Sequence, residues 1–174
     1  MSFEASDPRR WNEALSKALR AVRKARSMRT QEVADRMNMA QRTYEHFEGG
    51  GGKVSMEKIY AFAVATESDP FALIAATLIQ SPNLAARSAR NKLVLTLAIA
   101  LHDFNIEAGD DMDLLETGPL LTAFSEMFAG LAEEARRRRE AIDDLERRTK
   151  GWLRRQAAEP GGGREDHCRY GAGS

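Results

Sequence analysis

The sequence predicts an all-α protein built from two helical parts, and three observations support this fold class. Two short apolar runs with helical spacing lie between Met28 and Gly50, on either side of Asn38, which readily ends a helix because it tolerates a left-handed backbone. Further along, Asp69-Pro70 combines a helix-capping residue with a proline at the first helical position. After Pro119, about forty residues follow without another proline, and their apolar residues recur at alternating steps of three and four, which is typical of a long amphipathic helix.

Charge is unevenly distributed along the chain, although it sums to zero over the whole sequence. The segment from Arg9 to Lys53 has eleven basic and five acidic residues, whereas the segment from Ser81 to Gly118 has three basic and six acidic ones. A hydrophobic content of 43% is ordinary for a globular protein with a packed core. A basic module followed by an acidic one suits a nucleic-acid-binding domain with a separate second function.

The first part is expected to span residues 9–81 and to begin with a helix from about Arg10 to Arg26. The stretch from Met28 to Gly50 then predicts two short helices, and the small side chain of Ala34 allows the second to cross close to the first. The polar residues of the second helix would form one outward face: Gln41, Arg42, Thr43, Glu45 and His46. A short, rigidly held helix with such a face fits the major groove of DNA.

Here the chain resembles the phage-repressor-like (Cro/CI/Xre) family of helix-turn-helix DNA-binding proteins. The resemblance extends from about Leu15 to Leu73. It rests on spaced features that agree: Arg23, Ala34, the apolar series, Glu48-Gly-Gly and the apolar run before Asp69-Pro70. It implies a five-helix lambda-repressor-like domain in which Arg23 and Glu48 form a structural ion pair, since a guanidinium can hold a carboxylate with two bonds.

The sequence departs from the family pattern at four places. Thr30-Gln31 comes one place late, so either Arg29 or Thr30 can cap the second helix. Asn38 stands where a glycine is usual in the turn, and Ala40 lacks the oxygen that would cap the recognition helix, a loss of about 1 kcal/mol. The loop Gly49–Gly52 is richer in glycine than is usual for the family.

The outward face and the resemblance together assign candidate DNA contacts. Within the outward face, Arg42 suits a guanine edge and Gln41 an adenine, while Glu45 either accepts from cytosine or repels phosphates. Candidate base contacts are Gln41, Arg42, Thr43, Glu45 and His46. Candidate phosphate contacts are Arg29, Thr30, Gln31 and Lys53, with Thr30 and Gln31 acting through the positive end of the second helix.

Two further helices are expected to complete the first part. Ser55 caps the fourth, Asp69-Pro70 opens the fifth, and Ser81-Pro82 marks the edge of the domain. Their expected inward-facing residues are Met56, Ile59, Phe62, Ala63, Leu73, Ile74, Leu78 and Ile79.

The second part is expected to span residues 83–158. The segment from Leu93 to Leu101 is apolar nearly all round, which predicts a helix buried on several sides, as core or as a dimer interface. Gly109–Asp113 predicts a turn. The run Arg136–Arg139 is read as a solvated helix surface balanced by nearby acids rather than as a phosphate contact.

The last helix carries a heptad seam with apolar residues at eight of ten positions. Such a helix needs a partner, which is either its own copy or the Leu93–Leu101 helix. Gly130, Gly151 and the polar seam residue Arg138 count against one continuous dimeric coil, but we favour a homodimer because symmetric DNA sites favour dimers. The expected dimerising residues are Leu121, Phe124, Phe128, Leu131, Ile142, Leu145 and Trp152.

Residues 159–174 have no periodicity and are expected to be disordered. The single cysteine, Cys168, excludes an intramolecular disulfide and suits a reducing compartment. The sequence has no signal-peptide pattern, and its most apolar run is too short to span a bilayer. We therefore expect a soluble protein that lies in the cytoplasm, at the nucleoid, and has no membrane partner.

Catalysis is not expected. The three histidines form no metal set with other ligands, because His102-Asp103 lacks the further ligands of a phosphohydrolase site. The sequence has no phosphate-binding loop, dinucleotide fingerprint or nucleophile–base set. We therefore expect no cofactor, metal or enzyme activity.

The sequence thus predicts a homodimeric, sequence-specific transcriptional regulator of double-stranded DNA, with residues 40–48 as its recognition helix. The alternative is an interaction protein that binds another regulator or RNA polymerase through its C-terminal helices. The neutral net charge and the missing cap favour this alternative slightly.

Overall fold

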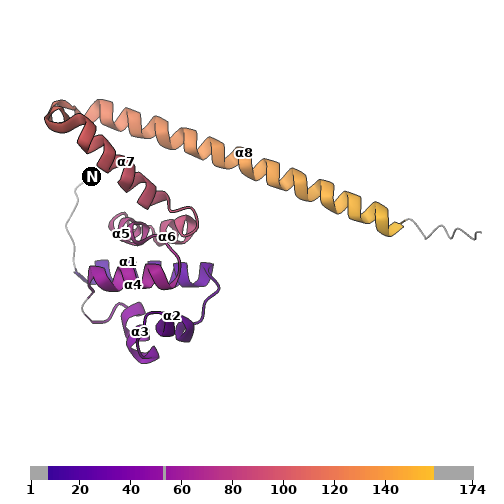
Figure 1. The fold of residues 1–174 in the computed structure, drawn as a ribbon, viewed down its shortest axis with the longest axis horizontal. Coiled ribbons are helices and arrows are strands. Elements are labelled where there is room, and N and C mark those ends of the chain that lie inside the picture. The colour runs from indigo at the N-terminus through magenta and orange to yellow at the C-terminus, as the bar shows by residue number, and fades with distance from the viewer. Residues whose placement is uncertain (1–7, 53, 159–174) are drawn as a thin grey trace, which may run out of the picture. The chain divides into compact units, whose positions relative to one another are not determined.

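The computed structural model describes residues 8–52 and 54–158, and every regular element in these ranges is helical, which confirms the all-α fold class. The described chain divides into an N-terminal unit that ends at Met112 and a C-terminal unit that begins at Asp113. In chain order the elements are α1 (Pro8–Ala25), α2 (Thr30–Arg36), α3 (Gln41–Glu48), α4 (Met56–Ala65), α5 (Pro70–Leu78), α6 (Pro82–Ser88), α7 (Leu93–Ala108), the 3-10 helix η1 (Gly109–Leu114) and α8 (Thr117–Ala158) (Figure 1).

The core of the N-terminal unit lies where α1, α3, α4 and α5 meet. Its centre is aromatic, since the ring of Tyr44 stacks on that of Phe62 at 6.5 Å between centroids. Ala34 is fully buried beneath this layer, as expected for the close crossing of α2 and α3. α6 packs against α1 and α5, and Ala85 and the C-cap residue Ala89 join the same core. The largest fully buried apolar side chains are Tyr44, Phe62, Leu15, Leu19, Leu73, Val22 and Val33.

A non-glycine residue with a positive φ follows the ends of several helices in this unit. Asn38 ends α2 in this way, with φ at 52°, which confirms the predicted turn. The amide of Met39 then donates to the carbonyl of Ala34 at 3.0 Å and satisfies a helix-end acceptor. Ser27 and Glu67 have the same conformation after α1 and α4.

Glu48, at the end of α3, forms the central ion pair of the N-terminal unit. The guanidinium of Arg23 donates to both of its carboxylate oxygens, at 2.6 and 3.1 Å, so the predicted pair is present. The hydroxyl of Tyr44 donates to the same carboxylate at 2.7 Å, and Ser16 donates to the backbone carbonyl of Glu48 at 2.7 Å. The hydrogen bond from Arg23 to Glu48 raises the pKa of Arg23. Burial raises the pKa of the Tyr44 hydroxyl, which therefore stays protonated and donates.

Asp69 caps two helices at once. One carboxylate oxygen accepts from the amides of Phe71 and Ala72 at the start of α5, at 3.0 and 3.1 Å. The other accepts from the amides of Val94 and Leu95 at the start of α7, at 3.0 and 2.9 Å. The sequence predicted the first role of Asp69, and the second fixes the start of α7 against α5.

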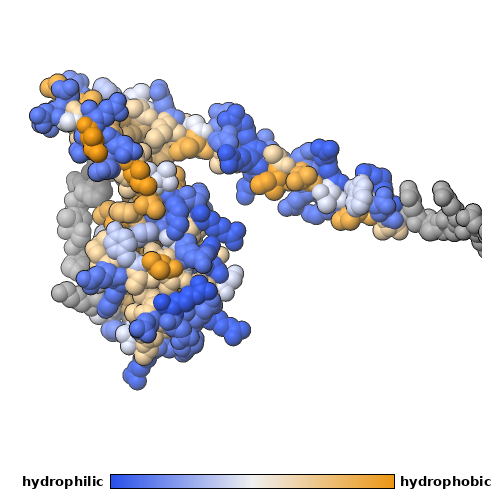
Figure 2. Space-filling model, viewed as in Figure 1, coloured by the Kyte–Doolittle hydropathy of each residue, from blue (hydrophilic) through white to orange (hydrophobic). Residues whose placement is uncertain are grey.

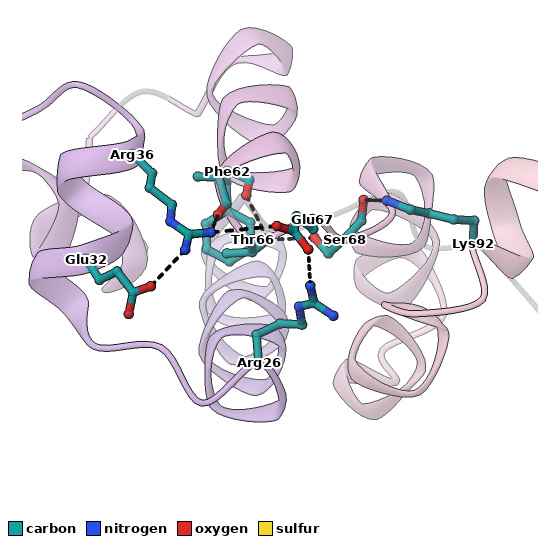
Figure 3. Close-up of polar contacts among 9 residues, drawn as sticks. Arg26, Glu32, Arg36, Phe62, Thr66, Glu67, Ser68 and Lys92 are labelled. Atoms are coloured by element: carbon teal, nitrogen blue, oxygen red, sulfur yellow. Dashed lines mark hydrogen bonds and ion pairs between the residues drawn. The ribbon is translucent and has the colours of Figure 1, made fainter.

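Polar contacts also hold the turn between α4 and α5. Figure 3 shows Arg26, from the turn after α1, and Arg36, from α2, on either side of Glu67, with nitrogen–oxygen distances of 2.6 and 4.0 Å. The hydroxyl of Thr66 lies 2.8 Å from that of Ser68, whose carbonyl accepts from the side chain of Lys92. These contacts join the turn after α1, α2, the end of α4 and the N-cap residue of α7 around one turn.

The prediction of burial is wrong for some residues. Met56, Leu78 and Ile79 are about half exposed, and each stands at an end of its helix, where fewer neighbouring residues can cover it. α7 has no buried residue, although burial on several sides was expected. Its first turn is tied to the start of α5 through Asp69, and the later residues Ile99 and Leu101 are 55% and 57% exposed. The expected turn at Gly109–Asp113 is the start of η1.

α8 is one unbroken helix of 42 residues, and neither Gly130 nor Gly151 interrupts it. No helix among the described residues is long and apolar enough to cross a membrane.

Replacing Glu48 tests the central ion pair. We expect Glu48→Ala to lower the free energy of unfolding by roughly 3 kcal/mol, because it leaves the guanidinium of Arg23 in a largely buried site without its partner. Chemical denaturation measures this loss. Glu13→Ala is the control, since it breaks an exposed pair with Lys17 and should leave the midpoint nearly unchanged. Equal effects of the two substitutions would contradict the role given to Glu48.

Replacing Asp69 tests the double cap. We expect Asp69→Ala to destabilise the protein by roughly 3 kcal/mol, against about 1 kcal/mol for Ser55→Ala, which removes a single capping bond in α4. Asp69→Asn keeps one oxygen for α5, so its destabilisation should lie between those of Asp69→Ala and Ser55→Ala. Thermal denaturation measures the order, and an effect of Asp69→Ala no larger than that of Ser55→Ala would contradict the double cap.

Candidate nucleic-acid interface

α3 presents a polar face to solvent and an anchored face to the core. Its buried residues are Tyr44, Phe47 and Glu48. The five candidate base contacts, Gln41, Arg42, Thr43, Glu45 and His46, are all exposed. The two sets alternate as a helix of 3.6 residues per turn requires. The face is held rigidly, because its anchors join an aromatic stack and the ion pair with Arg23.

Gln41 is held in place by neighbours on both sides. Its amide nitrogen donates to the hydroxyl of Thr30 at 3.2 Å and to the carboxylate of Glu45 at 2.7 Å. The contact with Glu45 follows from i,i+4 spacing on a helix, which the sequence alone could have indicated. The contact with Thr30 depends on how α2 crosses α3. With both amide hydrogens engaged, the carbonyl oxygen of Gln41 is the atom best placed to accept from a ligand.

Arg42 is the strongest donor on the exposed face of α3. Its guanidinium forms no ion pair with another described residue, whereas Arg36 on α2 pairs with Glu32 at 3.0 Å. An exposed guanidinium that is not already neutralised keeps its donors for a ligand, and its planar fork matches the two acceptors on a guanine edge. Thr43, beside it, adds an exposed hydroxyl.

The ring of His46 folds over the glycine loop that follows α3. A Cβ built on Gly51 would lie 2.3 Å from Cε1 and 2.5 Å from Nδ1 of His46, so the ring occupies the space that any other residue would need. Gly52 also lies beside the ring, and its φ of 74° favours glycine. The glycine-rich loop therefore sets where His46 lies at the end of the polar face.

The structure places three of the four candidate phosphate contacts at the start of α2. Arg29 is the N-cap residue, with an extended backbone and no side-chain capping bond, and Thr30 begins the helix, which settles the open alternative. Arg29 and Gln31 are exposed, but Gln31 donates to Asp35 at 2.7 Å. Lys53 lies outside the described residues. Thr30 links the candidate phosphate contacts to the candidate base contacts, because its hydroxyl accepts a hydrogen bond from the side-chain amide of Gln41.

A shallow cavity of about 290 Å³ is lined by residues 25–28 at and after the end of α1, by Glu32 and Arg36 of α2, by Glu67 and by Arg90. Its Arg26 and Arg36 already contact Glu67. No group of three or more metal-ligating side chains occurs among the residues that the structure describes.

The seven predicted dimerising residues all lie exposed on α8, where Figure 2 shows hydrophobic side chains between hydrophilic ones. Their exposed fractions run from 47% at Phe128 to 66% at Leu121. No described side chain of α8 is buried.

Comparisons with known proteins neither support nor contradict these assignments. No family model, no curated protein and no solved structure matches the chain.

A substitution in the loop tests the position of His46. We expect Gly51→Ala to displace the imidazole ring, because the added methyl group would overlap it, while the helices remain folded. The NMR chemical shifts of the ring protons of His46 report the displacement. Gly130→Ala is the control, since nothing lies near its Cβ position. Ring shifts unchanged in Gly51→Ala would contradict this packing.

Proposed function

We propose that the N-terminal unit is a helix-turn-helix domain of the phage-repressor-like type, and that the protein is a sequence-specific DNA-binding transcriptional regulator. The observation that carries this proposal is the division of α3 into a polar exposed face and an inner face fixed by Tyr44, Phe47 and Glu48. A protein reads base edges only if its donors and acceptors are held in a fixed geometry, which the inner face provides. α2 and the tight turn at Asn38 have the place and length that such a motif requires.

The exposed face offers a defined set of base contacts. Arg42 donates to the O6 and N7 atoms of guanine. The carbonyl oxygen of Gln41 accepts from the amino group of adenine or cytosine, in place of the two-bond adenine contact expected for a free glutamine. Glu45 holds Gln41 in this orientation. Thr43 and His46 flank these contacts, and Arg29 with Thr30 lies toward the DNA backbone.

In the proposed complex, the protein acts as a homodimer through α8. Two copies present two recognition helices, and their half-sites on DNA are related by the symmetry of the dimer. The exposed apolar residues of α8 support this proposal, since water-exposed leucine, phenylalanine and tryptophan at heptad spacing need a partner helix.

The second candidate function is that of an interaction protein, which binds another regulator or RNA polymerase through α7 and α8. The absence of any buried side chain on α7 favours this candidate. Three of its apolar residues, Ile99, Leu101 and Ile106, are more than half exposed. Large apolar side chains that are exposed together on one helix are typical of an interaction site.

Selection of bound sequences from random duplex DNA separates the two functions. Enrichment of a two-fold-symmetric motif, with binding that weakens steeply as salt rises, supports the regulator. Failure to enrich any sequence, with the helical content of the protein intact by circular dichroism, rejects it and favours the interaction protein.

A substitution of Arg42 tests the proposed base contact. We expect Arg42→Ala to weaken binding to the selected sequence by about 10- to 100-fold, the equivalent of roughly 1–3 kcal/mol, because it removes a guanine contact without disturbing the core. Binding to unrelated duplex DNA should fall much less. The measurement is a titration followed by fluorescence anisotropy. The control is Arg147→Ala, which removes the same charge from an exposed site on α8, and unchanged specific affinity in Arg42→Ala would refute the assignment.

A further inference from the structure

The charge on α8 changes sign along its length. From Thr117 to Ala135 the helix has three acidic residues and no basic one, whereas from Arg136 to Arg155 it has nine basic and four acidic residues. Two parallel copies would place like charges beside each other along the whole helix. Two antiparallel copies would place the acidic half of each against the basic half of the other, and opposite charges across an interface favour that orientation.

The seam of α8 contains one charged residue, Arg138, which distinguishes the two orientations. In a parallel pair with the seams in register, each seam residue faces its own copy, so two Arg138 side chains would meet in the interface. In an antiparallel pair centred between Arg136 and Arg137, each of the ten seam residues faces a seam residue of the other copy. Arg138 then faces Ala135, the smallest seam residue. The facing pairs are Leu121–Trp152, Phe124–Thr149, Phe128–Leu145, Leu131–Ile142 and Ala135–Arg138.

The conformation of Arg138 fits the antiparallel arrangement. Its guanidinium turns along its own helix to the carboxylate of Glu134, with a nitrogen–oxygen distance of 2.6 Å. This contact draws the charge to the flank of the seam and leaves the methylene stem across it, as long basic side chains do at helix interfaces. A small residue opposite, such as Ala135, leaves room for that stem.

We propose that α8 pairs with α8 of a second copy of this chain in antiparallel orientation, in the register that places Ala135 opposite Arg138. The proposal specifies the homodimer of the proposed function, but it does not depend on DNA binding. In this register the starts of the two α8 helices lie about 60 Å apart along the axis, from the rise of 1.5 Å per residue. The N-terminal units are therefore attached at opposite ends of the paired helices.

Distances between spin labels test the orientation in the full chain without DNA. Each label is attached to one introduced cysteine in a background of Cys168→Ser, and the sites Glu133→Cys, Glu126→Cys and Arg154→Cys lie off the seam. Pulsed electron spin resonance should give separations that increase in this order, with axial components of about 10, 30 and 50 Å. One short distance at all three sites would show a parallel pair and overturn the proposal, as would a monomer in sedimentation velocity.

Substitutions at the central pair, Ala135 and Arg138, give a second test. We expect Ala135→Arg to weaken association by about tenfold or more, because two arginines then face each other, and we expect the double variant Ala135→Arg/Arg138→Glu to restore it. In a parallel pair the double variant would place like charges together twice and stay monomeric, which would overturn the proposal. Ala129→Arg, an exposed position off the seam, is the control and should leave association unchanged.

The tests of the two proposals fail separately. A parallel pair overturns the arrangement of α8 and does not affect the selection of DNA sequences, whereas a monomer also overturns the homodimer of the proposed function. A failed selection rejects the regulator and leaves the measured pairing of α8 intact.

Discussion

The carboxylate of Glu48 is the interaction on which the N-terminal unit depends. It receives two bonds from Arg23 on α1 and one from Tyr44 on α3, while Ser16 binds the backbone carbonyl of the same residue. A buried carboxylate is costly unless its oxygens are satisfied, so these donors are required together. Because Glu48 is the last residue of α3, the network fixes that helix against α1. The orientation of the exposed polar face follows from it.

Much of the N-terminal unit could be predicted from the sequence, because its helices carry one apolar stripe each and end at recognisable residues. Asn38, Ser55 and Asp69-Pro70 mark their ends through local backbone chemistry. The errors at the end of α5 have one cause. Apolar spacing shows which face of a helix points inward but not how far the neighbouring helices extend, so Leu78 and Ile79 were expected in the core although they lie past its edge.

The candidate site was predicted as a set of residues but not as an arrangement. Helical spacing alone placed Arg42 and its neighbours on one face. The bond between Thr30 and Gln41 depends on how α2 crosses α3, and the position of His46 depends on how the loop returns past Gly51. Such contacts between elements have no local signal. Likewise, a heptad seam reads the same in both directions, so its spacing alone indicated a partner helix without indicating its orientation.

The double cap at Asp69 also has a consequence for local unfolding. If the first turn of α7 opened while α5 stayed folded, one oxygen of a buried carboxylate would lose both of its donors without gaining free access to water. That state is costly, so the two helix starts should open together as one cooperative unit. The amides of Val94 and Leu95 should then exchange their hydrogens at rates close to that of Ala72, although more than twenty residues separate them along the chain.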